Sequence, residues 1–141
     1  MAVDRAHLQW FYEQTHYTVV LPRQQLTFRI GRHDPALDQV LQQRCQVTRN
    51  WAILTPFNPG SEATDEDVNH LSLTRLRREL DEASIKHFNS VNQSPEGEWH
   101  ELGFLLVDAE AEVIKSAARR YRQNAYVAAA LGEAPQLVWM I

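Results

Sequence analysis

A strand that is apolar on both faces and runs directly into a polar loop most constrains the fold of this chain. Residues 51–54 read Trp-Ala-Ile-Leu, and Thr55–Ser61 follow with two prolines, one glycine and three short polar side chains. A strand with apolar side chains on both faces must be covered on both sides. The segment Trp51–Thr55 therefore predicts a central strand of a sheet that has other elements packed on it.

The rest of the pattern predicts hairpins and helices around that strand. Two alternating segments joined by Pro22–Gln25 predict an antiparallel hairpin, and 85–92 with 99–107 predict a second one. A last strand pair is expected over 125–131 and 136–141. Helices are expected over 4–14, over 35–46 with Asp34 as N-cap, from Thr64 onward with a stripe of Leu73, Leu76 and Leu80, and over 109–122 with Val113, Ile114, Ala117 and Tyr121 buried. We interpret residues 1–141 as one α+β domain with a mixed, mostly antiparallel sheet built from hairpins, and with helices packed on it.

Composition and charge narrow the possible partners. The chain has 141 residues, of which 44% are apolar, and a formal net charge of -4. This charge gives no electrostatic reason to expect nucleic acid or an anionic membrane as partner. The absence of a long apolar run argues against a membrane span. Cys45 is the single cysteine, which excludes an internal disulfide, and the six histidines have no metal-ligand spacing. We expect a cytoplasmic protein without metal or cofactor.

The loop after the central strand is the first candidate site. Thr55, Asn58 and Ser61 place three hydrogen-bonding side chains between a strand and a helix, where ligands often bind in open α/β sheets. The same residues also suit a tight turn, so a purely structural role stays open. A phosphate ligand is disfavoured, because Asp65, Glu66 and Asp67 occupy the first turn of the coming helix.

Other polar residues fall at positions where apolar ones are expected. Asn69 lies on the buried stripe of its helix, as either a satisfied core amide or a ligand-binding group. Glu101 shares a strand face with Trp99, so its pKa should be raised unless an arginine pairs with it. It is the candidate general base, with a structural ion pair as the alternative. Gly103 beside it leaves room for a ligand or another backbone. Asn124 is either a helix C-cap or a further ligand contact.

Several short segments together resemble a known family. They are Tyr17, Ile30-Gly31, the Thr-x-x-Asn-Pro-x-Ser run of 55–61 with Asn69 eight residues later, Glu98–Glu101 with Phe104-Leu105, and Gln123–Ala125. These segments are similar to an uncharacterised bacterial family, domain-of-unknown-function family 3293, over nearly the whole chain. Pro56 stands where that pattern has alanine, which bears on loop geometry. The resemblance implies a small stand-alone bacterial α/β protein and attaches no activity to it.

Two functions follow as hypotheses. In the first, Thr55, Asn58, Ser61, Asn69, Glu101 and Asn124, with Trp99 as an apolar wall, form a pocket of a binding protein or enzyme for a small polar molecule. In the second, the same polar residues are structural, and the chain is a non-enzymatic interaction or regulatory module. The sequence does not decide between an enzyme and a binding protein, and it leaves the oligomeric state open.

Overall fold

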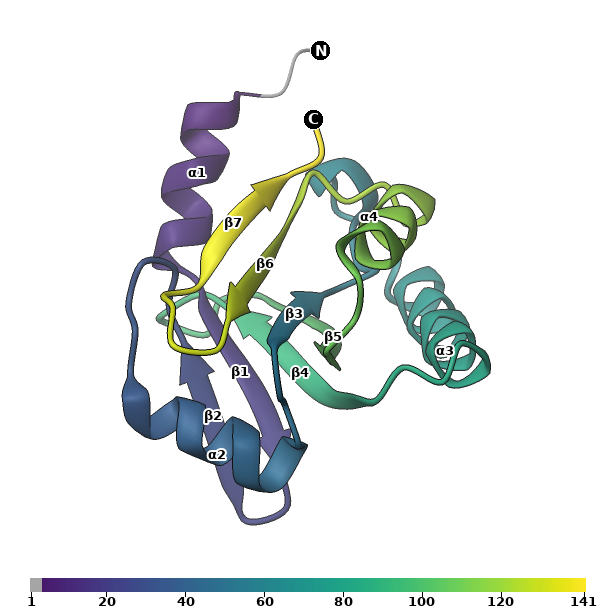
Figure 1. Cartoon of the computed structure of the whole chain (residues 1–141). Coiled ribbons are helices and arrows are strands. Elements are labelled where there is room, and N and C mark those ends of the chain that lie inside the picture. Colours follow the sequence, from purple (N-terminus) through teal and green to yellow (C-terminus); the bar gives the residue numbers. More distant parts are fainter. Residues whose placement is uncertain (1–3) are drawn as a thin grey trace.

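The computed structural model describes residues 4–141, which form four α-helices, one short 3-10 helix and seven strands (Figure 1). In chain order these elements are α1 (Arg5–Gln14), β1 (His16–Leu21), β2 (Gln24–Phe28), α2 (Pro35–Cys45), β3 (Asn50–Leu54), η1 (Pro59–Ser61), α3 (Glu66–Glu82), β4 (His87–Gln93), β5 (His100–Val107), α4 (Ala111–Arg120), β6 (Ala125–Ala130) and β7 (Gln136–Trp139). The expected α+β domain and both expected hairpins are confirmed, with boundaries that differ by at most two residues.

All seven strands belong to one sheet with the order β2-β1-β4-β5-β3-β6-β7, and each neighbouring pair is antiparallel. The prediction of a mostly antiparallel sheet is confirmed, and the pairings observed include no parallel one. β3 lies between β5 and β6, as expected for a strand that is apolar on both faces.

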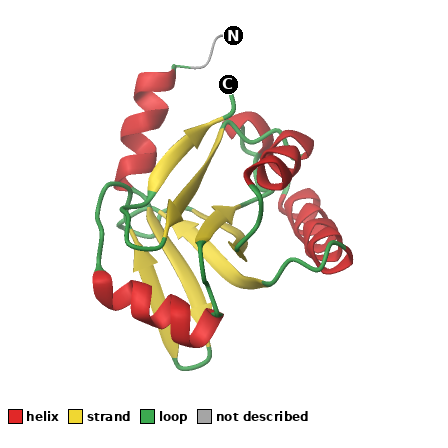
Figure 2. Cartoon of the chain, in the orientation of Figure 1, coloured by secondary structure: helices red, strands yellow, loops and turns green. Residues whose placement is uncertain are grey.

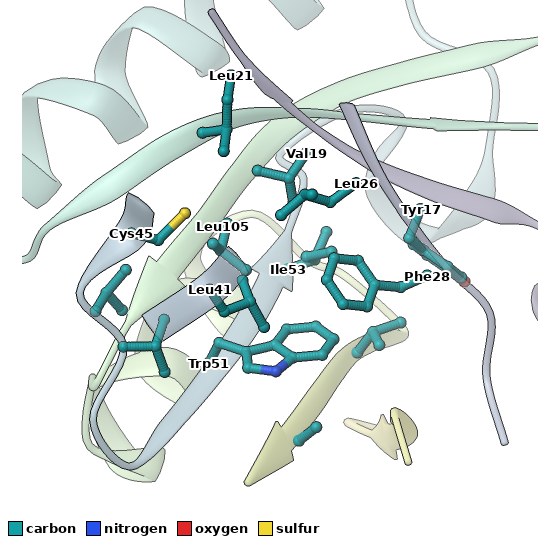
Figure 3. Packing of buried hydrophobic residues seen from close by; sticks show 14 residues of the cluster. Tyr17, Val19, Leu21, Leu26, Phe28, Leu41, Cys45, Trp51, Ile53 and Leu105 are labelled. Carbon is teal, nitrogen blue, oxygen red and sulfur yellow. The ribbon is translucent and has the colours of Figure 1, made fainter. Parts of the chain in front are cut away.

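The sheet is strongly curled. Three strands separate β2 from β3, so a flat sheet would place them about 19 Å apart at the usual strand spacing. The rings of Phe28 on β2 and Trp51 on β3 nevertheless lie 4.6 Å apart (Figure 3). In addition, the backbone N–H of Gly31, after β2, donates to the carbonyl oxygen of Pro135, before β7, at 2.8 Å. The two edges of the sheet therefore approach each other and enclose an inner face.

Helices cover both faces of this half-barrel (Figure 2). On β3, Trp51 and Ile53 belong to the inner core cluster, which α2 completes through Leu41 and Cys45. The alternate β3 residues Ala52 and Leu54 belong to a second cluster, which includes side chains from α3 and α4. Successive side chains of β3 thus point alternately into the two core clusters. The inner cluster is the one in which the curl of the sheet brings distant strands together.

Two local expectations are wrong. The N-cap of α3 is Asp65, whose side chain accepts from the N–H of Asp67 at 2.8 Å, and Thr64 precedes the helix. The backbone N–H of Thr64 donates to Oδ1 of Asn58 at 3.0 Å. Val113 is 43% exposed, because α4 turns its neighbour Ile114 into the core.

Gly103 permits a close backbone approach where β3 ends. A Cβ atom on this residue would lie 2.4 Å from the carbonyl oxygen of Leu54 and 3.0 Å from the Cα atom of Thr55. The chain leaving β3 therefore passes directly over β5 on the inner face. The sequence-based expectation that Gly103 accommodates another backbone is confirmed.

The Gly103→Ala variant is expected to lower the free energy of unfolding by about 1–3 kcal/mol, as for other overpacked positions. Thermal unfolding measures this, with Gln25→Ala at an exposed strand position as control. An unchanged melting temperature of Gly103→Ala would contradict the close approach.

Candidate functional site

A cavity of about 270 Å³ opens on the inner face. Its lining comes from α1, the strands and the loop that follows β3. The residues are Phe11, Tyr12, Tyr17, Ile53, Thr55, Asn58, Ser61, Ala63, Asn92, Trp99, His100, Glu101, Gln123, Ala125, Tyr126, Val127 and Leu137. Glu101 is the one carboxylate in this set, and the set contains no arginine or lysine. The pocket is thus an aromatic and aliphatic cavity with a single acidic side chain.

Three strands place a polar row across the floor of the pocket. Tyr17 on β1 is the direct partner of Asn92 on β4, and Asn92 is the direct partner of Glu101 on β5. Side chains at paired positions of neighbouring strands point to the same face and lie side by side. The strand register therefore assembles the row from residues that are far apart in sequence.

Glu101 is held by one amide and has no counter-charge within the part of the chain that the structure describes. The Nδ2 group of Asn58 donates to Oε2 of Glu101 at 2.8 Å. Within residues 4–141, Oε1 has no hydrogen-bond partner, and Glu101 forms no ion pair with an arginine. Burial raises the pKa of Glu101, and the hydrogen bond from Asn58 opposes that rise. The expected raised pKa is confirmed, and the arginine pair that was its alternative is not observed among these residues.

Asn58 is itself fixed by a pair of facing amides. Its backbone N–H donates to Oδ1 of Asn69 at 3.0 Å, and its own Oδ1 accepts from Nδ2 of Asn69 at 2.9 Å. The same Oδ1 accepts from the N–H of Thr64 at 3.0 Å. Asn58 has a φ of 50°, a left-handed conformation that asparagine tolerates better than most residues. Asn69 does not line the pocket; it holds the residue that binds Glu101.

Of the remaining predicted site residues, some line the pocket and others hold the lining residues in place. Trp99 lines the pocket and stacks on Phe11 with ring centroids 5.1 Å apart. Thr55 also lines it, but its hydroxyl donates to the carbonyl oxygen of Leu102 at 2.6 Å and so secures the bend after β3. Ser61 accepts from Nδ2 of Asn124 at 2.7 Å. Asn124 therefore lies behind the pocket wall and positions Ser61.

Sequence reasoning missed the tyrosines and Asn92. Tyr12 lies in the helix expected over 4–14, and it lines the pocket. Burial raises the pKa of Tyr12, a hydrogen bond with Ser61 lowers it, and the charge of Glu101 raises it. Tyr17 and Asn92 could have been found by setting the two predicted hairpins side by side in register.

Among residues 4–141, no helix is long and apolar enough to cross a membrane. The same part of the chain holds no group of three or more histidine, cysteine, aspartate or glutamate side chains that could bind a metal ion.

A protein-family model described as a protein of unknown function (DUF3293) matches residues 54–126. The match begins at the end of β3 and covers about half of the chain. It contains Asn58, Asn69, Glu101 and Asn124, and it leaves out Tyr17, Ile30 and Gly31. Neither the curated proteins nor the solved structures contain a match.

Replacing Asn69 should loosen the loop. Asn69→Ala would leave the buried N–H of Asn58 without its acceptor, at a cost of about 1–3 kcal/mol in unfolding free energy. Chemical denaturation measures this, and Asn89→Ala, at an exposed position of β4, is the matched control. Equal stabilities of the two variants would show that the facing amides do not hold the loop.

The stability of the Glu101→Gln variant relative to wild type should increase as the pH rises. Because the folded-state pKa of Glu101 is raised, the folded chain binds its proton more tightly than the unfolded chain does. The contribution of Glu101 to the free energy of unfolding of the wild type is therefore largest below the ordinary pKa of 4.5, and it decreases as the pH rises through the folded-state pKa. Glutamine does not titrate, so the melting temperature of Glu101→Gln relative to wild type should increase over this range.

Glu98→Gln removes an exposed carboxylate from the same hairpin and serves as the matched control. A relative stability of Glu101→Gln that decreases with pH would mean that the ionised carboxylate is stabilised by a partner.

Proposed function

We propose that this chain, which belongs to the DUF3293 family, binds a small polar molecule in the inner-face pocket. In this proposal, Glu101 receives a hydrogen bond or a proton from the bound molecule. The observation that carries the proposal is the state of Glu101. It lines the cavity, one carboxylate oxygen is fixed by Asn58, and the other has no partner among residues 4–141.

The energetic cost of this arrangement favours a function. A partly buried carboxylate without a counter-charge lowers stability, and an apolar residue at the same place would pack without that cost. Burial raises the pKa of Glu101, and a carboxylate with a raised pKa in a cleft is a candidate functional group. Asn58 is restrained by Asn69 and Thr64, so the carboxylate is oriented before any ligand arrives. Orientation in advance lowers the entropic cost of binding.

If the bound molecule reacts, Glu101 is suited to act as a general base. A carboxylate whose pKa is raised toward neutrality removes protons more effectively than an ordinary one. Tyr12 is a neutral hydroxyl at the same pocket, because burial and the nearby carboxylate both raise its pKa. The two groups together offer a proton acceptor and a proton donor to one ligand.

We place this function in the cytoplasm, on the ground that Cys45 is a buried free thiol in a chain with no other cysteine. The net charge of -4 supports a small-molecule partner over nucleic acid or an anionic membrane.

One observation favours the second hypothesis, an interaction or regulatory module. Val68 and Leu71 on α3 are 51% and 60% exposed, and they lie one turn apart on the same side of the helix. A partner protein that covers them would bury this apolar surface. This contact would not involve the pocket, so the experiment below separates the two functions.

A metabolite library screened by thermal shift should give at least one compound that stabilises the wild-type chain. Ala63 is exposed and lines the pocket, so Ala63→Trp should obstruct the pocket and abolish the shift. The control Ala36→Trp adds the same side chain at an exposed position of α2 and should keep the shift. A library without any stabilising compound, or compounds whose effect survives in Ala63→Trp, would contradict binding in this pocket.

A further inference from the structure

We propose that the ligand carries a protonated amine, whose ammonium group binds Glu101 and Asn92 and lies against the aromatic wall of the pocket. This inference rests on the proposed function and adds the chemical class of the ligand. It depends on three features of the pocket: its charge, its free acceptors and its aromatic rings.

The charge of the lining disfavours an anionic ligand. Glu101 is the only carboxylate, and the lining holds no arginine or lysine to bind a second negative charge. Its one histidine, His100, adjoins Glu101 on β5, so strand alternation directs its side chain to the opposite face. Tyr12 and Tyr17 remain protonated, because burial, the largest cause, raises both pKa values and the charge of Glu101 raises them further. A phosphate or carboxylate ligand would therefore face like charge, whereas a cation would compensate Glu101.

Two acceptors on neighbouring strands lack partners. Oδ1 of Asn92 is buried and has no hydrogen bond within the described residues, and the Asn92 side chain is 6% exposed. Asn92 is paired directly with Glu101 and also lines the pocket. A buried acceptor without a donor costs stability, and a turn of the Asn92 amide toward the cavity would let a donor on the ligand recover that cost. An ammonium group has three N–H donors and can serve Asn92 and Glu101 together.

The aromatic rings favour the same ligand. Trp99 and Phe11 are stacked. Three tyrosines bring the number of phenylalanine, tyrosine and tryptophan rings in the lining to five: Tyr12, Tyr17 and Tyr126. The face of an aromatic ring attracts a cation, most strongly for tryptophan. An anion gains nothing from these faces, and a neutral alcohol gains only apolar contact. All three features thus select a cation with an apolar body.

Three probes of nearly equal shape test this selection by calorimetry on the unmodified chain: phenethylammonium, phenethyl alcohol and phenylacetate. We expect the ammonium compound to bind at least about ten-fold more tightly than the alcohol, a difference of about 1.4 kcal/mol. Phenylacetate should bind most weakly. Glu101→Gln should reduce the affinity for the ammonium compound about ten-fold and leave that for the alcohol nearly unchanged, while Glu98→Gln should alter neither.

The outcomes separate this inference from the proposed function. If the alcohol or phenylacetate binds as tightly as the ammonium compound, and Ala63→Trp abolishes that binding, the pocket binds ligands but does not select cations. If no probe binds at millimolar concentration, the inference is wrong, and the library screen then decides whether the pocket binds anything. The comparison of probes on the wild-type chain stands even where Glu101→Gln does not fold.

Discussion

The hydrogen bond from Asn58 to Glu101 connects the loop after β3 to strand β5, and the neighbouring contacts fix both residues in position. Asn58 belongs to the loop after β3, and Glu101 belongs to β5. The loop reaches β5 because Gly103 lets the backbone of Leu54 pass directly over it. Asn69 then fixes the amide of Asn58 from α3. Gly103, the loop after β3 and helix α3 thus together fix the position of the Glu101 carboxylate.

The curl of the sheet gives this carboxylate its surroundings. In a flat sheet, β7 would lie three strand spacings, about 14 Å, from β5. In the curled sheet, Leu137 of β7 lines the same cavity as Glu101, and Phe11 of α1 stacks on Trp99, next to β5. The pocket is therefore the part of the inner face that the core side chains and α2 leave unfilled. Burial without a counter-charge follows from that position.

Much of this could be predicted from the sequence, since it depends on local pattern. The alternation of apolar and polar residues predicts the hairpins, and the apolar residues on both faces of β3 predict its central position. Glu101 stands out as an acidic residue on an otherwise apolar strand face. What could not be predicted depends on register and curl between distant strands. Tyr17 and Asn92 join the site only through the β1–β4 and β4–β5 pairings. Asn69 and Asn124 were placed in the right neighbourhood, but sequence spacing cannot tell a lining residue from its support.

The central claim is that Glu101 is a partly buried carboxylate, held by an amide and without a cationic partner among residues 4–141. The carboxyl ¹³C resonance of Glu101, assigned by its loss in Glu101→Gln and followed through a pH titration, measures this directly. The account predicts a titration midpoint above the ordinary value of 4.5, because burial disfavours the ionised form. A midpoint at or below 4.5 would mean that the carboxylate is solvated or paired with a cation, and it would contradict the account.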